Sequence, residues 1–439
     1  NLEQNLFHCG NAMFELIIEG GSKLSGELKV SGNKNAALPM IAASILTDQE
    51  LIIHNVPDIL DVKNMIEIAS LLGVESTFTK GTLRLNASNI KSNSLDQELS
   101  SRLRASILFV GPILARTFRV NFFSPGGDRI GRRRLDAHIY GFKCLGASFF
   151  ETDNNYLLEA KNGLKGRELF FDEPSVTATE NVLMAAVLSK GRTIMRNTAS
   201  EPHVVELGQL LIKMGAKISG LGSDTLIIDG VEKLNGAEWT IGADHIEAGS
   251  FIALATATGS DLKINGTKPS SLWMTRRIFE KFNAKFELKK DFIRVPPEQK
   301  LKINQEIGNA IPVISDGPWP QFPTDMMSCT IVMATQARGT VMFFEKMFES
   351  RIFFVDSLIS MGVNAVICDS HRVIINGPSQ LHPTELKIPD IRAGMAMVIA
   401  ALCAKGKSNL RYADILMRGY ENLFEKLKSL NAKIELKKC

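Results

Sequence analysis

The chain repeats one short pattern six times. A Gly or Asn, followed by Ala or Val and then by a short strand pattern, recurs at positions 73, 146, 215, 283, 362 and 431. The successive spacings are 73, 69, 68, 79 and 69 residues, so six units account for nearly all of the 439 residues. A fixed period of this size is typical of one supersecondary unit that is copied and stacked. We therefore expect the unit to define the fold, and the differences between the six copies to define the function.

Each unit is predicted to contain a strongly apolar helix, a strand, an amphipathic helix and a hairpin. The apolar helices are expected at 36–46, 105–115, 181–188, 250–258, 326–335 and 393–404. Helices that are apolar on nearly every face are buried on all sides. The amphipathic helices, which carry apolar residues at i, i+3 and i+4, are expected at 62–72, 135–145, 204–214, 351–361 and 420–430. This order predicts an α/β fold in which buried helices are surrounded by sheets and half-exposed helices.

Composition excludes several classes of function. The net charge of +4 is too small to indicate nucleic acid by itself, and the apolar stretches are shorter than the roughly 20 residues of a membrane span. The six cysteines show no metal-binding spacing, which favours reduced thiols in a cytoplasm. The first dozen residues lack the pattern of a signal peptide. We expect a cytoplasmic protein with no membrane, nucleic acid, metal or cofactor.

Polar residues are concentrated where the buried helices are expected to begin. The segments at these positions are 32–35, 173–176, 242–245 and 389–392. Helix N-termini expose unpaired N–H groups that favour anions. Several such ends that face one cleft would form an anion site.

Three features carry candidate chemistry, and each has a simpler interpretation. Lys34 on the first turn of a buried helix opposes the helix dipole unless an anion offsets it, but it could be a solvated side chain. The loop 124–134 packs four arginines and three glycines, which suits phosphate binding, a basic surface loop or an RNA contact. Asp325, after a segment with six of the sixteen prolines, could be a base or part of an N-cap. Their occurrence together across different repeats favours a ligand site.

At these residues the chain resembles the UDP-N-acetylglucosamine 1-carboxyvinyltransferases, which are enolpyruvyl transferases of peptidoglycan synthesis. The resemblance runs from about residue 14 to the C-terminus and is carried by the segments 31–39, 104–107, 125–127, 322–325 and 418–421. It implies a two-domain inside-out α/β barrel with three repeats per domain. Domain I would comprise residues 35–241, and domain II residues 1–34 plus 242–439, with chain crossings near 32–35 and 242–247.

The resemblance also implies a role for each site residue. Lys34 and Asn35 would hold phosphoenolpyruvate, Arg392 and Arg418 would complete its pocket, and Asp325 would take the proton of the sugar 3′-hydroxyl. Asp128 would donate a proton to the methylene carbon. The remaining residues would bind substrate: Arg104, Arg133, Arg134, Leu135, Asp136, Ala137, Glu173, Pro174, Ser175, Val176, Met347, Arg351 and Asp390.

Three positions depart from the family pattern. Most members carry Cys where this chain has Asp128, and that Cys is the target of fosfomycin. A carboxyl group must be kept protonated in order to donate, and it is a weaker nucleophile than a thiolate. We therefore expect insensitivity to fosfomycin. Arg134 stands where proline is usual and Glu173 where a basic residue is common, which affects the nucleotide contacts rather than the reaction.

Three alternatives remain. The shikimate-pathway enolpyruvyl transferase shares the six-unit fold, but its Gly-Asn-Ala-Gly-Thr signature is missing from this sequence. A ring of six repeats around nucleic acid would distribute basic residues evenly over its inner helices, and the inner helices here are apolar. A family member that has lost activity would not be expected to retain Lys34, Asp325, Arg392 and Arg418.

Overall fold

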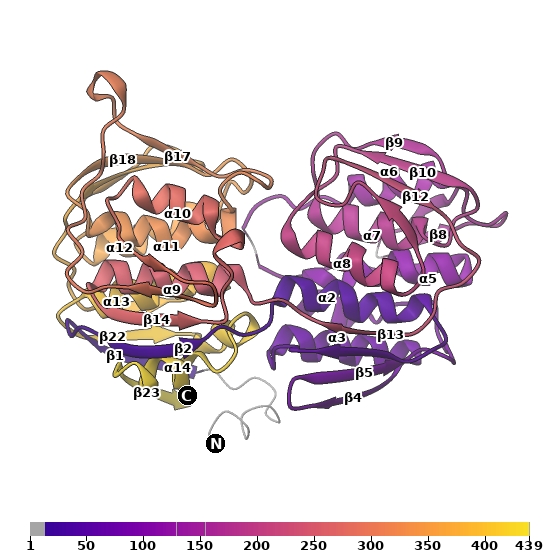
Figure 1. The fold of residues 1–439 in the computed structure, drawn as a ribbon, viewed down its shortest axis with the longest axis horizontal. Helices are drawn as coiled ribbons and strands as arrows, with labels where there is room; N and C mark the ends of the chain where they lie inside the picture. Colours follow the sequence, from indigo (N-terminus) through magenta and orange to yellow (C-terminus); the bar gives the residue numbers. More distant parts are fainter. Residues whose placement is uncertain (1–13, 129, 154, 439) are drawn as a thin grey trace. The chain divides into compact units, whose positions relative to one another are not determined.

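The computed structural model describes residues 14–128, 130–153 and 155–438, which form two compact units (Figure 1). Unit 1 contains 14–31, 130–132 and 243–438, and unit 2 contains 32–128 and the described part of 133–242. Unit 2 holds the first three repeats and unit 1 the last three. The change of unit at 31/32 and 242/243 lies within three residues of the boundaries expected from the sequence.

Three buried helices form the centre of each unit, as the apolar segments predict. In unit 1 they are α9 (His245–Thr258), α11 (Thr324–Thr335) and α13 (Ile391–Cys403), which pack against one another. In unit 2 they are α2 (Lys34–Ala43), α7 (Val176–Ala186) and the 3₁₀ segment η3 (Arg104–Phe109) that continues into α5 (Val110–Thr117). Helices α7 and α9 begin five residues earlier than expected because their first turns are polar. Those polar first turns carry the candidate site.

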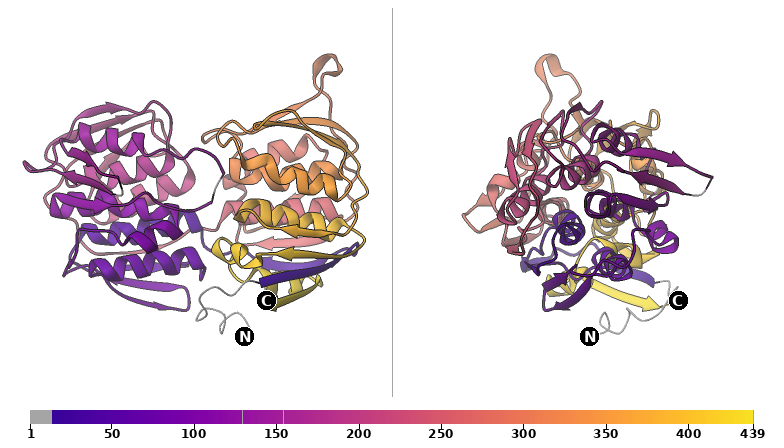
Figure 2. Two further views of the ribbon diagram at one scale, coloured as in Figure 1. Left: turned by 180° about the vertical axis from the view of Figure 1, so that it is seen from behind. Right: turned by 90° about the vertical axis from the view of Figure 1, so that its right-hand side faces the viewer.

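Six small sheets enclose these helices, three in each unit. Figure 2 shows strands on the outside of the helices in each unit. The sheets of unit 1 have the orders β21-β22-β1-β23, β15-β16-β14-β2 and β17-β18-β20-β19. Their strands are β1 (Phe14–Gly20), β2 (Ser25–Lys29), β14 (Asp261–Asn265), β15 (Glu287–Leu288), β16 (Phe292–Val295), β17 (Val313–Ser315), β18 (Gly339–Phe344), β19 (Ala365–Ile367), β20 (Arg372–Gly377), β21 (Glu385–Lys387), β22 (Gly406–Arg411) and β23 (Lys433–Lys438).

The sheets of unit 2 have the orders β13-β3-β5-β4, β6-β8-β7 and β11-β12-β10-β9. Their strands are β3 (Leu51–His54), β4 (Glu75–Thr79), β5 (Thr82–Asn86), β6 (Arg119–Phe122), β7 (Ser148–Glu151), β8 (Tyr156–Glu159), β9 (Glu168–Phe170), β10 (Arg192–Arg196), β11 (Lys217–Ser219), β12 (Thr225–Asp229) and β13 (Ala237–Thr240). Five of the six sheets contain one parallel pair of strands. In three of these pairs, β9–β10, β17–β18 and β21–β22, the two strands precede and follow the same inner helix.

Two strands pair in one unit and lead into the other. Strand β2 pairs in parallel with β14 of unit 1, yet the chain continues from it to α2 of unit 2. Strand β13 pairs with β3 of unit 2 and continues to α9 of unit 1. The two chain crossings are therefore flanked by strands that hydrogen-bond within a sheet.

Outer helices cover the sheets. They are α3 (Leu60–Leu72), α6 (Asp136–Cys144), α8 (Pro202–Lys213), α10 (Trp273–Glu280), α12 (Val355–Ser360), which continues η6 (Arg351–Phe354), and α14 (Leu423–Ser429). The amphipathic pattern predicted these helices except α10, and it placed the start of α14 three residues too early. Shorter helical segments are η2 (Ser44–Leu46), α4 (Gln97–Arg102), η4 (Pro269–Ser271), η5 (Ile307–Asn309) and η7 (Ala413–Arg418).

The recurrent Gly or Asn of the sequence has one backbone conformation in all six repeats. The φ angle is positive at Gly73, Gly146, Gly215, Asn283, Gly362 and Asn431, each of which follows an outer helix. Gly and Asn are the residues that adopt this left-handed conformation at least cost, and they commonly end helices. The repeat is thus visible in the sequence because each copy requires the same turn. Among the helices of the described residues, none is both long enough and apolar enough to cross a membrane.

Candidate active site

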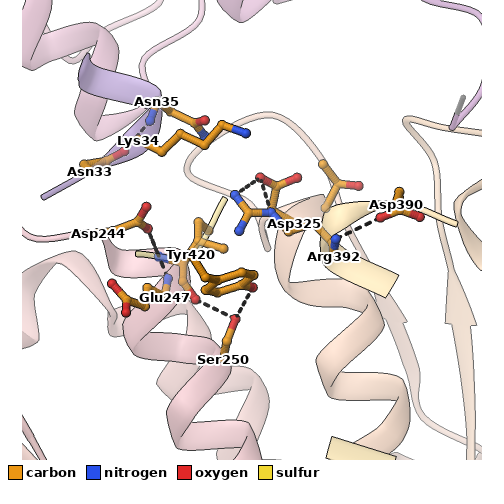
Figure 3. Close-up of polar contacts among 12 residues, drawn as sticks. Asn33, Lys34, Asn35, Asp244, Glu247, Ser250, Asp325, Asp390, Arg392 and Tyr420 are labelled. Carbon is orange, nitrogen blue, oxygen red and sulfur yellow. Dashed lines mark hydrogen bonds and ion pairs between the residues drawn. The ribbon is translucent and has the colours of Figure 1, made fainter. Parts of the chain in front are cut away.

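Asp325 lies in the first turn of α11, at the end of the proline-rich segment. Its Oδ1 accepts a hydrogen bond from Nη1 of Arg351 at 2.9 Å. Its Oδ2 lies 3.0 Å from Nη2 of Arg392 (Figure 3). The N-cap of α11 is Pro323, which provides no side-chain cap. The carboxylate is therefore bound between two guanidinium groups, and helix capping does not account for it. Hydrogen bonds between a carboxylate and guanidinium groups are charge-assisted, so the two arginines fix the orientation of this side chain.

Both arginines are buried, with exposed fractions of 5% for Arg351 and 6% for Arg392. Burial is the largest influence on the pKa of each guanidinium and lowers it, but the neighbouring acidic groups, of which Asp325 contributes most, together outweigh burial, so the net pKa is raised. An arginine that is out of water must be paired, and Asp325 supplies the pairing charge for both. An anionic substrate that entered here would meet two fixed positive charges.

Arg392 also contacts the ring of Tyr420, whose hydroxyl contacts Ser250. The guanidinium carbon of Arg392 lies 5.6 Å from the centre of the Tyr420 ring, within the range of a cation–π contact. The Tyr420 hydroxyl and Oγ of Ser250, on α9, are 3.0 Å apart. Burial raises the pKa of Tyr420, so the phenol stays neutral. These contacts fix the direction in which Arg392 points.

Asp390 and Asp244 are the N-caps of α13 and α9. Oδ1 of Asp390 accepts hydrogen bonds from the backbone N–H groups of Arg392 and Ala393 at 2.9 and 3.0 Å. Asp390 therefore caps the N-terminus of α13. Because this cap fixes the start of the helix at Ile391, it also fixes the backbone position from which the Arg392 side chain extends to Asp325.

A buried lysine lies at the start of α2 in unit 2, where the sequence predicts an anion-binding position. Nζ of Lys34 forms a 2.6 Å ion pair with Asp61, in the first turn of α3, and the two side chains are 9% and 3% exposed. Oδ1 of Asn33 caps the helix by accepting hydrogen bonds from the N–H groups of Asn35 and Ala36. The alternative of a solvated lysine is therefore wrong. Asp61 is a partner that sequence reasoning missed.

The proposed nucleotide-binding residues of unit 2 come from η3 and the starts of α6 and α7. Nη2 of Arg104 donates a hydrogen bond to the carbonyl of Arg134 at 3.1 Å. Burial, followed by the charge of Arg133, lowers the pKa of Arg104 to about 10. Arg134 itself is exposed and pairs with Asp136, two residues away. A half-buried cation next to a second cation is a favourable position for an anionic ligand.

His138 connects α6 with the first turns of α7. The Nδ2 group of Asn181 donates to Nδ1 of His138, and the other ring nitrogen, Nε2, is 3.1 Å from Oγ1 of Thr177. Since Nδ1 accepts, Nε2 carries the proton and donates it to Thr177. Burial lowers the pKa of His138 to about 3, so this tautomer persists at neutral pH. Sequence reasoning did not identify His138 or Thr177.

Ser175 caps α7 through a hydrogen bond from the N–H group of Ala178. The neighbouring Glu173 is exposed, whereas Pro174 and Val176 are half-buried. The N-terminus of an 11-residue helix that packs next to Arg104 and the 133–137 segment provides the N–H groups that favour a phosphate.

The loop that carries Asp128 is held at both of its ends. On one side, a Cβ at Gly126 would lie 1.6 Å from the Ser101 carbonyl oxygen, so only glycine allows this approach. Gly127, with a φ of 103°, follows it. On the other side, within unit 1, Glu349 accepts a hydrogen bond from the N–H of Arg132 at 3.0 Å, and Ile130 is buried. Asp128 lies between these anchored segments and is half-buried.

The remaining predicted residues lie in unit 1. Met347 follows β18, and its N–H donates a 3.2 Å hydrogen bond to the buried carboxyl of Glu345. Arg418 is the last residue of η7, which packs on α13. It lies before the outer helix α14 and is not part of it. A Cβ at Gly419 would lie 2.4 Å from Ile391, so glycine is required for η7 to approach the start of α13.

Within the units, the structure brings together two groups of predicted residues. In unit 1 these are Asp325, Arg351, Asp390 and Arg392, with Met347 and Arg418 on adjacent segments. In unit 2 these are Lys34 with Asn35, and Arg104 with 133–137 and 173–176. Each group presents buried cations at the N-terminal turns of inner helices.

A fold of six such units with cationic helix ends defines the enolpyruvyl transferase class. A family model described as EPSP synthase (3-phosphoshikimate 1-carboxyvinyltransferase) matches residues 18–427, and the chain belongs to this family. Among solved structures, it is similar to the enolpyruvyl transferase NikO from Streptomyces tendae, with a TM-score of 0.87 at 22% identity over 98% of this chain and 100% of that one. An EPSP synthase from Acinetobacter baumannii has a TM-score of 0.73 at 16% identity over 97% of this chain and 100% of that one.

The more similar relatives in sequence are UDP-N-acetylglucosamine 1-carboxyvinyltransferases. The enzyme of that name from Treponema denticola is 51% identical over 97% of this chain and 100% of its own length. The one from Bradyrhizobium diazoefficiens is 48% identical over 97% of this chain and 98% of its own length.

Proposed function

We propose that the chain transfers the enolpyruvyl group of phosphoenolpyruvate to the 3′-hydroxyl of UDP-N-acetylglucosamine and releases phosphate, in the first committed step of peptidoglycan synthesis. The observation that carries this proposal is the ionised carboxylate of Asp325, held at 2.9 and 3.0 Å by two buried arginines. The identity of 51% over 97% of the chain to an enzyme of this name supports the choice of acceptor.

Asp325 would act as the base. It accepts the proton of the sugar hydroxyl while that oxygen attacks C2 of phosphoenolpyruvate, and Asp128 delivers a proton to the methylene carbon C3. The product of this addition is a tetrahedral intermediate. Its decay removes one proton from C3 and expels phosphate from C2, which restores the double bond. A base and an acid at fixed positions typically contribute 10²–10⁴-fold each to such a reaction.

Phosphoenolpyruvate carries a phosphate and a carboxylate, so its site must supply several cations. Lys34, Arg392 and Arg418 would supply them, and Asn35 would bind alongside. Lys34 and Arg392 already have internal carboxylate partners, Asp61 and Asp325. These internal partners hold the cations in place before the substrate arrives, which reduces the reorganisation required in the reaction.

The sugar nucleotide would bind through its diphosphate to cations and helix N–H groups. The half-buried Arg104 and the N-terminus of α7 suit this role. Under this proposal the complete set comprises Arg104, Arg133, Arg134, Leu135, Asp136, Ala137, Glu173, Pro174, Ser175, Val176, Met347, Arg351 and Asp390.

The proposed partners are the two small-molecule substrates alone, without nucleic acid, membrane or cofactor. Cys144, Cys329, Cys368 and Cys403 are free thiols. Free thiols are typical of a reducing compartment, and we propose that the protein acts in the cytoplasm.

Phosphate release from phosphoenolpyruvate tests the proposal. We expect release that depends on UDP-N-acetylglucosamine, together with formation of its enolpyruvyl ether in equal amount. The family model is described by a different acceptor, 3-phosphoshikimate, which makes that compound the second candidate. Release that depends on shikimate 3-phosphate instead would overturn the proposal and establish the alternative.

A further inference from the structure

Two carboxyl groups, those of Asp316 and Glu345, are buried near the start of α11, at the ends of neighbouring strands of one sheet. In the parallel pair β17–β18, Ser315 lies opposite Phe344, so Asp316 and Glu345 are the next residues of the same register. Neighbouring positions of adjacent strands place their side chains about 5 Å apart. Both residues have an exposed fraction of 0%. The proximity of Asp316 raises the pKa of the Glu345 carboxyl.

Glu345 organises the residues around the proposed base. Its two carboxyl oxygens accept hydrogen bonds from Oγ1 of Thr324 at 3.0 and 2.9 Å, and Thr324 directly precedes Asp325. Its Oε1 also accepts from the N–H groups of Met347 and Phe348 at 3.2 and 3.1 Å. One buried side chain thus connects the start of α11 to the segment that carries Met347.

Asp316 holds the same segment from the other strand. Its Oδ1 accepts a hydrogen bond from the N–H of Lys346 at 2.5 Å. Its Oδ2 is buried, and the structure gives it no donor among the N–H and O–H groups of the described residues. The Glu345 carboxyl, at the next position of the adjacent strand, could supply a proton to this oxygen if it is protonated.

Two negative charges cannot both be stable in this position. The guanidinium of Arg351 lowers the pKa of Glu345, but its hydrogen bonds go to Asp325 and the Thr324 carbonyl. His371 donates from Nδ1 to the backbone carbonyl of Glu345 and so does not neutralise the carboxyl. Burial, followed by the proximity of Asp316, raises the pKa of Glu345 to about 9. Carboxyl pairs in this arrangement retain one proton between them.

We propose that Asp316 and Glu345 share one proton, and that this pair is a positioning device for Asp325 and the Met347–Phe348 segment. The proposal rests on the function proposed above for its effect on catalysis, but the shared proton is a property of the free protein. With one proton in the pair, the charge of Arg351 is directed to Asp325. Loss of that proton would create a second anion that competes for Arg351 and would weaken the arrangement of the base.

Infrared spectroscopy of the full-length protein without substrate tests the shared proton. The pair should give a protonated-carboxyl band at neutral pH that shifts in deuterium oxide and disappears in Asp316→Asn and in Glu345→Gln. Glu180, a buried acid of unit 2, provides a matched control because its pKa is also raised well above the usual range. Glu180→Gln should remove a different band and leave that of the pair. A wild-type spectrum in which neither Asp316→Asn nor Glu345→Gln removes a band would overturn the shared proton, whatever the outcome of the activity assay.

Steady-state kinetics test the positioning role. In Asp316→Asn and Glu345→Gln an amide N–H replaces the shared proton, so each variant keeps the single negative charge of the pair. We expect the kcat of both amide variants to be within about threefold of wild type at neutral pH. Near pH 9 the amide variants should not show the loss of activity that deprotonation of the pair would cause in wild type. Glu345→Ala should lose about tenfold or more in kcat. Amide variants as impaired as Glu345→Ala, or an Ala variant with normal kcat, would contradict the role. If wild type releases phosphate but the variants show either of these two outcomes, the proposed function is retained and only the positioning role is rejected.

Discussion

Oδ2 of Asp325 and Nη2 of Arg392 lie 3.0 Å apart although 67 positions of the sequence separate the residues. Each is the second residue of an inner helix, α11 or α13, in two successive repeats. The repeat therefore places residues of equivalent position next to each other. The two copies differ at this position, which is an aspartate on α11 and an arginine on α13. The candidate site of unit 1 is built from this relation.

Replacing Asp325 by Asn should abolish most of the activity. The variant keeps the shape of the side chain but removes the proton acceptor, so kcat should fall by about 10² or more while the KM values change little. It also leaves two buried arginines without their charge partner, and the unfolding free energy should drop by about 3 kcal/mol. Phosphate release and thermal unfolding measure the two effects.

The matched control is Asp356→Asn, which changes an exposed acid on α12, the helix that follows Arg351. Its activity and stability should be close to wild type. Turnover by a folded Asp325→Asn variant at the control's rate would show that the carboxylate is not the base.

The Lys34–Asp61 ion pair should be required for stability because both side chains are buried. Asp61→Asn leaves the lysine charge uncompensated in the interior and should cost about 3–5 kcal/mol of unfolding free energy. The neighbouring pair of Lys63 and Asp58 has a similar distance of 2.7 Å, but its side chains are 32% and 49% exposed. Asp58→Asn should therefore cost less than about 1 kcal/mol.

Phosphoenolpyruvate offers a second readout of this pair. If Lys34 binds the substrate anion, adding phosphoenolpyruvate should restore part of the stability that Asp61→Asn loses, since the ligand supplies a new negative charge. Chemical denaturation with and without the substrate measures this. Equal destabilisation by both Asn variants would indicate that the buried pair is no different from the exposed one.

Part of this site could be predicted from the sequence and part could not. The six turns, the inner helices and the positions of Asp325 and Arg392 follow from periodicity, from the polar residues at helix starts and from family motifs. Asp61, Asp316 and Glu345 were missed because each acts through a partner on a different element. Such pairings depend on strand register and on packing between helices, which no local pattern of residues encodes.

Glu180 should make the stability of unit 2 decrease as the pH rises. Burial, followed by the charge of Glu201, raises the pKa of Glu180 well above its value in the unfolded chain. The folded state therefore retains a proton that the unfolded state loses, so this contribution is complete below the unfolded pKa and is lost with increasing pH. The slope is about 1.4 kcal/mol per pH unit for one proton.

Glu180→Gln should remove that slope, because the amide is neutral at every pH. Unfolding temperatures measured from about pH 5 to about pH 8 should decline less in this variant than in wild type. Glu98→Gln, at a side chain that is 78% exposed, should keep the wild-type slope. Parallel curves for wild type and Glu180→Gln would mean that Glu180 is ionised in the folded protein.

The final prediction concerns Asp128 as the proton donor in place of the Cys found in most members of the family. Asp128→Ala should lower kcat by about 10² or more, because it removes the proposed proton donor. Wild type should resist inactivation by fosfomycin, since a carboxylate attacks the epoxide far more slowly than a thiolate. Asp128→Cys should turn over and become inactivated with time.

Thiols elsewhere must not produce the same result, and the chain provides two checks. Cys368 is already exposed in wild type, so sensitivity that required only an accessible thiol would be present without mutation. Asp153→Cys places a new thiol at an exposed position of unit 2 outside the 124–134 loop, and it should remain insensitive. Mass spectrometry of the treated variants should find the adduct on residue 128 of Asp128→Cys alone. An Asp128→Ala variant with normal turnover, or wild type inactivated as fast as Asp128→Cys, would identify Asp128 as a turn residue with no part in proton transfer.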